Sequence, residues 1–487
     1  MFLKDLIESA DHAGLTAMTR EMEVSGICTD SRRVSPGDLF VALPGSRYHG
    51  REFIPEALRR GARAVIVDQL NMDLSSVTQG CCVIPVQDPR AVLTVALRRF
   101  YGLRPPGPKV VGVTGTNGKT TVTYLLESFF HQIGRRCGVI GTVNYRFGQR
   151  VIPAKNTTPG IADNYRILSD MAAAGMDYIF MEVSSHALDQ KRVDGIGFSA
   201  AVFTNLTQDH LDYHKNTEEY FKAKSVLFTG LPSQALAVIN TDCVYGRQLR
   251  SLTAARVVSY GVKGQADIIA EEIHSGPRQT QFTLLGPDCR IPIVTSLFGQ
   301  HNIYNILAAA ALGLHQGLSP EDIRAGVAAL SSVPGRMEAV PTGRDFDVFI
   351  DYAHTPDALE SVLTSIREIH QGKVILVFGC GGDRDRDKRP LMGQIAARLA
   401  DYSIVTNDNP RSEDPHDIAR QIVAGFEGQP HTVILDRKQA IAEALRRACP
   451  GSVVLIAGKG HEDYQVFRDR VVPFREREIL ADLLKIA

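Results

Sequence analysis

One stretch, Gly112-Val-Thr-Gly-Thr-Asn-Gly-Lys-Thr-Thr121, constrains the fold of this chain more than any other. Before it, the β-branched run of residues 109–113 predicts a buried strand. After it, apolar residues recur at helical spacing along one face, at Val122, Leu125, Leu126, Phe129, Phe130 and Ile133. Strand, glycine loop, Lys-Thr and helix form a phosphate-binding loop, in which backbone N–H groups and Lys119 face phosphates and the Thr120 hydroxyl faces magnesium.

The spacing departs from the common form of this loop, because Val113 stands where the first glycine is expected, five residues before Gly118. A bare Gly-Lys-Thr also occurs in ordinary turns, so a glycine-rich turn that binds nothing is the alternative. The strand before it and the amphipathic helix after it favour the nucleotide site.

Composition limits the other possibilities. A chain of 487 residues suggests about three domains. Lys+Arg and Asp+Glu both number 54, which gives no indication of a nucleic-acid or membrane partner. No apolar run approaches the roughly 18 residues of a membrane span, and the start has no signal-peptide pattern. The eight cysteines include no CxxC pair, so neither a zinc site nor a disulfide framework is expected. We expect a cytoplasmic protein.

Short strands and helices alternate along the whole chain, which favours parallel sheets covered by helices. Two turn-rich stretches, residues 103–109 and 331–337, read as linkers. They predict three domains, at residues 1–104, 105–334 and 335–487. The predicted strands are residues 38–43, 62–67, 178–183, 200–204, 347–351, 373–378, 402–406, 432–435 and 452–456, with helices at 52–61 and 89–101.

Three patches of the middle segment are hard to explain by packing alone. Glu182 stands at the carboxyl end of a predicted strand, where ligands bind to open parallel sheets, and could hold magnesium opposite Thr120. The alternative is a carboxylate that caps the next helix. His210 and His214 are spaced i, i+4, but no third soft ligand is near, so a magnesium site that accepts one imidazole is favoured over zinc. A cap or a surface group is the alternative for a histidine at a helix start.

The third patch holds two positions that lie in or near helices. Lys224 falls within the helical pattern of Tyr220 and residues 226–228, and on its own would be a solvated lysine. The stretch 298–302 precedes another helix, and its Asn302 could bond an adenine edge.

Together, Gly115-Thr-Asn-Gly-Lys-Thr120, Glu182-Val-Ser-Ser-His186, Asp209-His210, Ala223-Lys224 and His301-Asn302 resemble the Mur ligase family of ATP-dependent amide-forming enzymes. The resemblance covers almost the whole chain and accounts for the missing first glycine. It implies an α/β fold of three domains: an N-terminal UDP-binding domain, a central P-loop ATPase domain with a parallel sheet, and a C-terminal Rossmann-like domain that presents an amino acid.

The resemblance also implies the active-site roles. Lys119, Glu182, His210 and Lys224 are expected to be catalytic, with ATP as co-substrate. Two magnesium ions are implied, one held by Thr120 and Glu182 and the other near His210. Lys224 is expected to carry a CO₂-derived carbamate, which turns a cation that would repel magnesium into a ligand. The expected ATP-binding residues are Gly115, Thr116, Asn117, Gly118, Lys119, Thr120, Thr121, Asn302, Arg336 and Asp351.

The outer segments resemble the parts of the family that bind the other two substrates. The residues matched to a UDP-N-acetylmuramoyl dipeptide are Thr29, Ser31, Arg47, Tyr48, His49, Asn156, Thr157, Thr158, Ser184, Gln190 and Arg192. The residues matched to the amino acid are Arg389, Asp408, Asn409, Pro410, Arg411, Gly458 and Glu462. The implied substrates are UDP-N-acetylmuramoyl-L-alanyl-D-glutamate, meso-diaminopimelate and ATP, and a monomer is expected.

The tetrad Asp408-Asn-Pro-Arg411 on its own is only a turn after a strand. In the family it resembles the form that selects meso-diaminopimelate over L-lysine. Diaminopimelate has one more carboxylate than lysine, and an arginine fork suits it. Asp408, Asn409 and Glu462 could receive the ammonium of the same end, and Arg389 could meet a carboxylate. Sites built around a polar partner reject analogues that lack it by roughly 10⁴-fold or more.

Three alternatives stay open. One is the same ligase with L-lysine as substrate, which Arg411 opposes. Another is a different amide ligase of the family, such as a D-glutamate adder, a D-alanyl-D-alanine adder or a folylpolyglutamate synthase. The last is a P-loop switch that binds nucleotide without making a bond, and it would show no substrate-dependent ATP turnover.

Overall fold

The computed structural model describes residues 1–7, 20–45, 48–68, 81–103, 107–276 and 279–486. Contacts divide the chain into two compact units. One unit comprises Met1–Lys109 with Thr158–Ile179 and His186–Gly197, and the other comprises Val110–Thr157, Phe180–Ser185 and Phe198–Ala487. Residues 104–106 of the first predicted linker lie outside the described residues.

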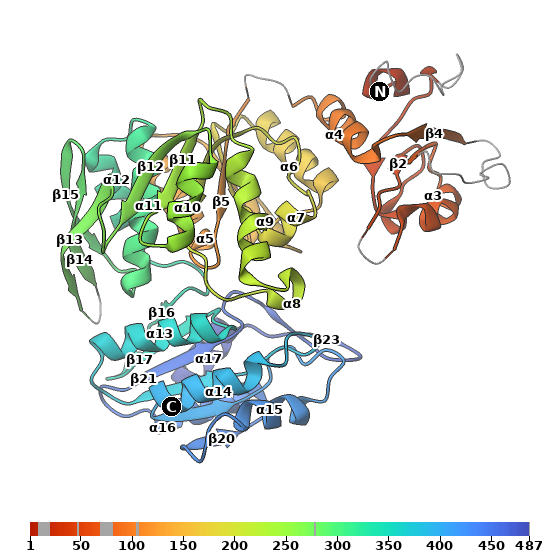
Figure 1. The fold of residues 1–487 in the computed structure, drawn as a ribbon. Helices are drawn as coiled ribbons and strands as arrows, with labels where there is room; N and C mark the ends of the chain where they lie inside the picture. Colours follow the sequence, from red (N-terminus) through yellow and green to blue (C-terminus); the bar gives the residue numbers. More distant parts are fainter. Residues whose placement is uncertain (8–19, 46–47, 69–80, 104–106, 277–278, 487) are drawn as a thin grey trace. The chain divides into compact units, whose positions relative to one another are not determined.

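The N-terminal unit is built on a four-stranded parallel sheet in the order β1-β2-β3-β4. Its strands are β1 (Ile27–Cys28), β2 (Leu39–Val41), β3 (Ala64–Asp68) and β4 (Cys82–Val86). One face packs on α1 (Leu3–Leu6), α4 (Pro89–Phe100) and α6 (Ile161–Ala173), and the other on α3 (Ile54–Arg59), as Figure 1 shows for α3 and α4. The helix predicted at residues 52–61 is shorter, because residues 50–53 form a 3₁₀ turn.

The second unit contains an eleven-stranded sheet, and one of its inner strands leads into the phosphate-binding loop. The order is β15-β14-β13-β12-β11-β10-β5-β9-β6-β7-β8. From β5 (Lys109–Thr114), the sheet continues in parallel through β10 (Phe198–Phe203), β11 (Leu236–Asn240) and β12 (Arg256–Gly261), with β9 (Tyr178–Glu182) on the other side of β5. Helices α5 (Lys119–Gln132), α11 (Gln300–His315) and α12 (Pro320–Ala329) pack on one another beside this sheet, while α9 (Thr217–Thr229) packs on α10 (Val244–Leu252) (Figure 1).

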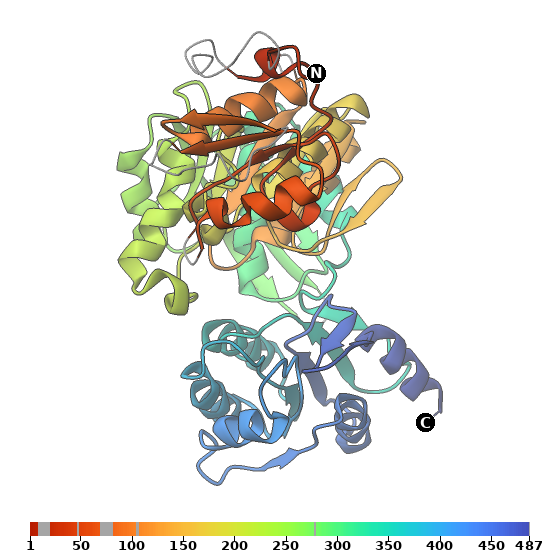
Figure 2. The same ribbon diagram turned by 90° about the vertical axis from the view of Figure 1, so that its right-hand side faces the viewer.

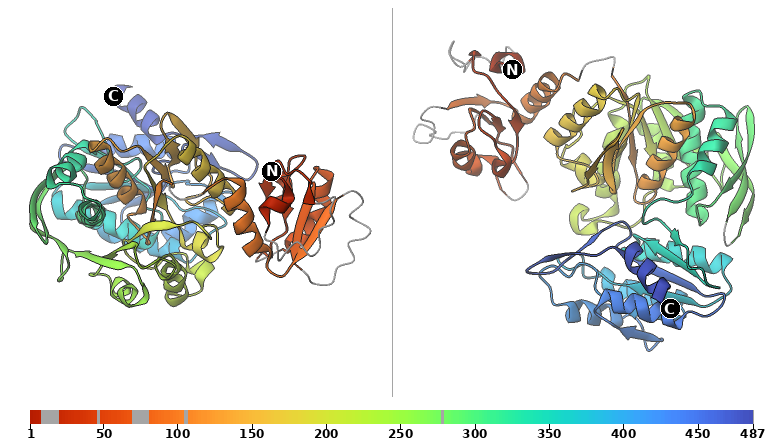
Figure 3. Two further views of the ribbon diagram at one scale, coloured as in Figure 1. Left: turned by 90° about the horizontal axis from the view of Figure 1, so that it is seen from above. Right: turned by 180° about the vertical axis from the view of Figure 1, so that it is seen from behind.

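Three strands that pair antiparallel with one another finish each side of this sheet. One side ends in β6 (Cys137–Ile140), β7 (Asn144–Phe147) and β8 (Arg150–Pro153), and the other in β13 (Ile268–Ser275), β14 (Thr280–Gly286) and β15 (Cys289–Thr295) (Figure 3). The outermost strands, β8 and β15, each contain an arginine and a proline. The alternation of strands and helices predicted the parallel centre but not these hairpins.

The C-terminal part of this unit has a six-stranded sheet in the order β16-β17-β21-β18-β19-β20, parallel except for the β16–β17 pair. One face packs on α13 (Pro356–Ile369), α14 (Lys388–Leu399) and α15 (Pro415–Val423), and the other on α16 (Arg437–Arg447) and α17 (Glu476–Ile486) (Figure 2). The strands are β16 (Glu338–Val340), β17 (Asp347–Asp351), β18 (Val374–Phe378), β19 (Tyr402–Val405), β20 (His431–Val433) and β21 (Val453–Ala457), followed by the hairpin of β22 (Tyr464–Val466) and β23 (Val471–Pro473).

The predicted apolar face of α5 is confirmed for five of its six residues, which are fully buried: Val122, Leu125, Leu126, Phe129 and Phe130. The prediction that Ile133 belongs to this buried face is wrong, because Ile133 caps the end of the helix and is 38% exposed. No helix among the described residues is both long enough and apolar enough to cross a membrane.

Candidate active site

The loop between β5 and α5 has a shape that only glycine allows at two positions. Gly115 and Gly118 have φ angles of 148° and 90°. A Cβ atom at Gly115 would overlap the Thr204 hydroxyl, and one at Gly118 would overlap the Asn305 side chain. The loop therefore has no space for side chains there, and α5 begins directly at Lys119.

Two lysines converge on this loop, of which Lys224 is fully buried and Lys119 half-buried. Lys119 Nζ donates to the carbonyls of Gly115 and Thr116 at 2.9 and 2.8 Å, and Lys224 Nζ donates to the same Gly115 carbonyl at 2.9 Å. Burial lowers the pKa of Lys119, and it holds the pKa of Lys224 well below its usual value, with the Lys119 charge acting in the same direction. The reading of Lys224 as a solvated helix lysine is therefore wrong, since its side chain points into the loop.

A hydroxyl and a carboxylate meet beside the lysines. Thr120 Oγ1 donates to Glu182 at 3.0 Å, and Arg336 Nη2 donates to Thr120 Oγ1 at 3.1 Å. Thr142 also donates to Glu182, from its backbone nitrogen at 2.9 Å and from its hydroxyl at 2.8 Å. Glu182 therefore faces the phosphate-binding loop.

The oxygen atoms of Thr120 and Glu182 suit magnesium, which prefers oxygen ligands and usually keeps several water molecules. No group of three or more His, Cys, Asp or Glu side chains able to hold a metal occurs in the described part of the chain. A magnesium ion at Thr120 and Glu182 would therefore take its other ligands from phosphate oxygens, water or a carbamate.

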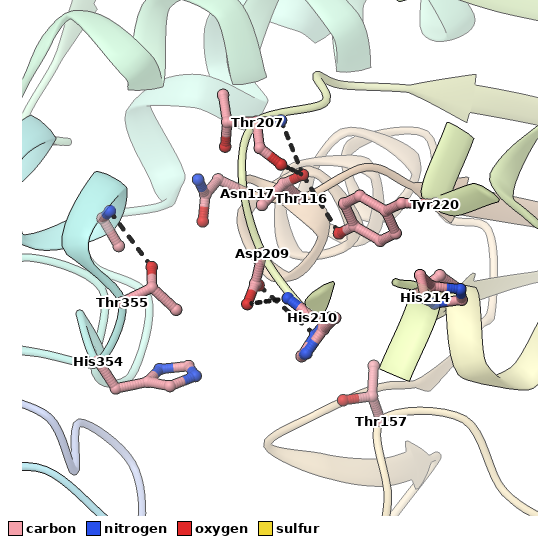
Figure 4. Close-up of polar contacts among 12 residues, drawn as sticks. Thr116, Asn117, Thr157, Thr207, Asp209, His210, His214, Tyr220, His354 and Thr355 are labelled. Carbon is pink, nitrogen blue, oxygen red and sulfur yellow. Dashed lines mark hydrogen bonds and ion pairs between the residues drawn. The ribbon is translucent and has the colours of Figure 1, made fainter. Parts of the chain in front are cut away.

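His210 lies beside Asp209 at the carboxyl end of β10 (Figure 4). Its backbone nitrogen donates to Asp209 Oδ1 at 2.8 Å, and its ring Nε2 lies 3.5 Å from Asp209 Oδ2. Desolvation lowers the pKa of His210, which favours the neutral imidazole that binds metals. His210 does not share a helix with His214, because α8 (Leu211–His214) begins one residue later, and the His214 ring instead lies 2.9 Å from the Ser185 hydroxyl.

Asp357 is a residue of this site that sequence reasoning missed. It accepts hydrogen bonds from the Asn117 amide at 3.1 Å and from the Thr207 hydroxyl at 2.8 Å. It lies in the first turn of α13, whose N-cap Thr355 appears in Figure 4 with His354. Thr142 was missed as well. Its position just after β6, at the same kind of strand end as Glu182, was the available signal.

The remaining ATP-binding predictions fall on side chains that already have partners. Asn302 is buried, donates to the Phe298 carbonyl at 2.7 Å and accepts from Asn305 at 2.9 Å. It lies inside α11, not before it, because this helix begins at Gln300. Asp351 accepts from the backbone nitrogens of residues 337 and 353, both at 2.7 Å, and burial raises its pKa.

The predicted amino-acid residues gather around Lys459. Its side chain is fully buried, and Nζ lies 3.2 Å from Asn409 Oδ1, 3.0 Å from Glu462 and 3.7 Å from Asp408. Asn409 also donates to Glu462 at 2.8 Å. Gly458, with a φ of 115°, lets the backbone pass close to Asp408. The sequence predicts that Asp408, Asn409 and Glu462 bind the ammonium of a substrate. In the structure, these side chains already lie close to the ammonium of Lys459.

The two predicted arginines differ in their surroundings. Arg389 is fully buried, and its guanidinium donates to both oxygens of Glu413 at 3.0 Å and to Gln421 at 2.7 Å. Arg411 is half-buried, has a φ of 52° and donates to the Gly382 carbonyl at 2.7 Å. Contact of either arginine with a substrate carboxylate stays a prediction.

Three family models match this chain. The Mur ligase middle domain matches residues 113–313, the Mur ligase glutamate ligase domain residues 335–460, and the Mur ligase family catalytic domain residues 23–101. A UDP-N-acetylmuramoyl-L-alanyl-D-glutamate–2,6-diaminopimelate ligase of Geobacter metallireducens is 45% identical over 484 residues, covering 94% of each chain. The chain belongs to the Mur ligase family.

Other Mur ligases are also similar to this chain in sequence or in fold. A ligase of the same name from Synechococcus elongatus is 46% identical over 465 residues, covering 94% of this chain and 93% of the relative. A solved structure of a ligase of that name has a TM-score of 0.70 at 30% identity, covering 100% of this chain and 99% of that chain. The MurF ligase of Thermotoga maritima, solved with ADP, shares the fold with a TM-score of 0.63 at 20% identity.

In this Mur ligase, the residues predicted to bind the UDP-muramoyl dipeptide divide between the two units. Thr29, Ser31, Tyr48, His49, Thr158, Gln190 and Arg192 belong to the N-terminal unit, and Asn156, Thr157 and Ser184 belong to the other. Arg47 lies outside the described residues.

Several of these side chains have local partners. Ser31 donates to Glu56 at 2.7 Å, and Arg192 donates to the carbonyl of Thr158 at 3.1 Å and to Gln190 at 3.0 Å. In the other unit, the Thr157 hydroxyl lies 3.0 Å from that of Thr142, which connects it to the Glu182 site.

Proposed function

We propose that this Mur ligase joins meso-diaminopimelate to UDP-N-acetylmuramoyl-L-alanyl-D-glutamate with the hydrolysis of ATP, in the cytoplasmic synthesis of peptidoglycan precursors. Relatives named for this activity are 40–46% identical to the chain over nearly its whole length. The observation that carries the proposal is the meeting of Thr120, Glu182 and Lys224 at the phosphate-binding loop, because a simple nucleotide switch needs no such cluster.

The reaction has two steps. The γ-phosphoryl group of ATP passes to the glutamyl carboxylate, which gives an acyl phosphate and ADP. The amine of diaminopimelate then attacks the acyl carbon, the C–O bond to phosphate breaks, and the amine proton leaves with the phosphate. Most of the catalysis is positioning and charge stabilisation.

The residues of the loop would bind and orient the phosphates. Lys119 would exchange its two carbonyl contacts for phosphate oxygens, while the backbone N–H groups at the start of α5 face the same charge. Thr120 and Glu182 would hold one magnesium ion, and His210 and a Lys224 carbamate the second. Bound magnesium would neutralise charge on the transferred phosphoryl group. Thr142 and Arg336 would orient Glu182 and Thr120.

The acceptor would bind at the carboxyl end of β19. We assign its ammonium to Asp408 and Glu462 and its distal carboxylate to Arg411, since a guanidinium matches a carboxylate with two parallel hydrogen bonds. We propose the same three domains as above: residues 1–104 for the UDP end, 105–334 for ATP and 335–487 for the amino acid. Closure of these domains would exclude water from the acyl phosphate. We also propose that the protein works as a monomer.

The test is phosphate release by the purified protein with ATP, magnesium and the UDP-muramoyl dipeptide, in parallel reactions with meso-diaminopimelate, L-lysine or no amino acid. We expect turnover with meso-diaminopimelate only. Turnover with L-lysine alone would support the ligase activity but contradict the proposed specificity. No turnover in any reaction would overturn the proposed function.

A further inference from the structure

Helix α6 belongs to the N-terminal unit, although it follows the phosphate-binding loop in the sequence. Ile161 and Tyr165, spaced i, i+4, lie on one face of the helix and pack into the core of that unit. These contacts fix the start of the helix against the four-stranded sheet. Asp163 and Asn164 lie between them in the first turn and make polar contacts with three other segments.

Asn164 is a fully buried amide that joins two backbone segments. Its Nδ2 donates to the carbonyl of Pro159 at 3.1 Å and to the carbonyl of Arg192 at 2.8 Å. Because both partners are carbonyl oxygens, the NH₂ group must face them, and Oδ1 has no hydrogen-bond partner among the described residues. A buried oxygen without a partner is unfavourable, so this asparagine is explained by the two carbonyls that it joins and not by the stability of the core.

Both carbonyls belong to segments that are matched to the UDP-muramoyl dipeptide. Pro159 directly follows Thr158, and Arg192 is itself one of the matched residues. Arg192 Nη1 donates to the Thr158 carbonyl at 3.1 Å, and its Nε donates to Gln190 Oε1 at 3.0 Å. Asn164 therefore completes a network of hydrogen bonds in which these two segments are bound to each other and to α6.

Asp163 connects α6 to a third segment. Its Oδ2 and Oδ1 accept from Arg33 Nη1 and Nη2 at 2.7 and 2.8 Å. Arg33 ends the 3₁₀ turn Ser31–Arg33, which contains the matched Ser31. Arg166 of the same helix lies 3.6 Å from Asp163 as well. The pair of Arg33 and Asp163 is partly exposed and adds little to stability, but its two parallel hydrogen bonds fix how the turn meets the helix.

We propose that Asp163 and Asn164 are positioning residues for the UDP-muramoyl dipeptide, because the first turn of α6 holds together three segments that bind it. This inference rests on the proposed function. The segments, at residues 29–33, 158–159 and 190–192, lie far apart in the sequence and share no helix or strand. A substrate that contacts all three binds tightly only when their spacing is already fixed, since otherwise part of the binding free energy is used to order them.

The test compares the full-length protein with Asn164→Leu, which removes both donors and keeps a similar side-chain size. Isothermal titration calorimetry with UDP-N-acetylmuramoyl-L-alanyl-D-glutamate, in the presence of magnesium and a non-hydrolysable ATP analogue, measures the Kd. We expect this Kd to rise about ten-fold, the effect of losing two hydrogen bonds that order the site. The Kd of the ATP analogue should stay within about two-fold, because the phosphate-binding loop belongs to the other unit.

The matched control is Ser169→Ala on the same helix. Ser169 Oγ also donates to a backbone carbonyl, that of Tyr101 at 2.9 Å, but Tyr101 is not matched to a substrate. Its loss should leave the Kd of the dipeptide substrate within about two-fold. An unchanged Kd in Asn164→Leu, or an equal rise in Ser169→Ala, would overturn the inference.

Should Asn164→Leu fail to fold, the partly exposed pair of Arg33 and Asp163 decides the question. Asp163→Lys opposes Arg33 with a like charge and should raise the Kd of the dipeptide substrate about five-fold. Asp163→Lys/Arg33→Glu restores opposite charges and should return the Kd to within about two-fold of the original. The repulsion from Arg166 is present in both variants and does not affect their comparison. Equal Kd values for the single and double variants would contradict the proposal.

The turnover of the same variants separates positioning from a merely structural role. With all three substrates saturating, kcat should stay within about three-fold, since neither residue is expected to touch the reacting groups. A loss of kcat with an unchanged Kd would show that the residues only maintain the fold, and would overturn the inference. Failure of the unaltered protein to bind the UDP-muramoyl dipeptide would overturn the proposed function as well. Tight binding there, with unchanged Kd values in the variants, would overturn the role of α6 alone.

Discussion

Lys119 and Lys224 donate to the same carbonyl, and this shared contact affects the chemistry open to Lys224. An amine reacts with CO₂ only in its neutral form, and burial together with the Lys119 charge lowers the pKa of Lys224. A carbamate at this position would replace the uncharged amine by an anion, which the neighbouring Lys119 cation and the proposed magnesium ions would stabilise.

We therefore expect Lys224→Ala to lose activity and to regain part of it when short-chain carboxylates are added, because they can occupy the place of the carbamate. The measurement is phosphate release with and without added formate or acetate. Lys222→Ala is the matched control, since this exposed lysine lies on the same helix and should keep full activity without any response. Full activity of Lys224→Ala, or no response to the carboxylates, would contradict the carbamate.

Glu413 gives a prediction about pH. The hydrogen bonds from Arg389 lower its pKa from 4.5 to about 2. Its contribution to folding is therefore complete above about pH 5 and is lost as the pH falls from 4.5 towards 2. We expect Glu413→Gln to reduce the free energy of unfolding by about 3 kcal/mol at pH 7, and the difference from the original protein to shrink below pH 4.5.

Thermal unfolding at several pH values measures this difference. Glu478→Gln serves as the control, because Glu478 is 66% exposed in its pair with Arg475 and should change stability by only a few tenths of a kcal/mol. A difference for Glu413→Gln that stays constant from pH 7 to pH 3 would rule out this linkage.

At the scale of single residues, sequence patterns found side chains with recognisable motifs and missed those identified only by contacts. Glu182 is the last residue of β9, His210 follows β10, and both lie near the loop as their positions suggested. Thr142 and Asp357 belong to no recognisable motif, and only the folded structure shows their contacts with Glu182 and Asn117. The spacing of residues in the sequence also does not show which side chains are buried. For this reason, the helical pattern around Lys224 alone predicted a solvent-exposed lysine.

At the scale of elements, the turn into α5 is the most constrained part of the chain. We expect Gly118→Ala to raise the KM for ATP at least ten-fold, because alanine is strained at a φ of 90° and its Cβ would overlap Asn305. Gly134→Ala at the other end of the same helix is the matched control. Its φ is also positive, at 69°, but nothing lies within 4 Å of the added Cβ, so the KM for ATP should not change. Equal effects of the two substitutions would show that backbone strain, not the shape of the loop, sets nucleotide binding.

The parallel strands were predictable because they are short, apolar and separated by helices. Residues 347–351 form β17 as expected, and most of the other predicted strands differ by one or two residues at their ends. The hairpins β6–β8 and β13–β15 were not predictable in the same way, because their alternating polar residues resemble loops until their partners are known.

At the scale of the whole molecule, the two compact units predict two separable unfolding transitions. The phosphate-binding loop belongs to the larger unit, and Thr29 and Ser31, matched to the UDP end, belong to the other. A non-hydrolysable ATP analogue with magnesium, at about 100 times its Kd, should stabilise only the larger unit, by about 2.7 kcal/mol. UDP should raise the midpoint of the other transition.

Differential scanning calorimetry measures both transitions, and Lys119→Met should remove the response to the ATP analogue and keep the response to UDP. A single transition that rises with either ligand would contradict independent units.

The outermost strands of the eleven-stranded sheet have a consequence for how the protein behaves at high concentration. An unpaired strand edge offers N–H and C=O groups to any other chain, and such edges start aggregation. Here β8 carries Arg150 and Pro153, and β15 carries Arg290 and Pro292. A proline cannot donate a ladder hydrogen bond, and a charged side chain resists close approach of a second edge. A sheet of this width is thereby protected at both margins against strand-to-strand polymerisation, which helps the protein to remain dispersed during synthesis and storage.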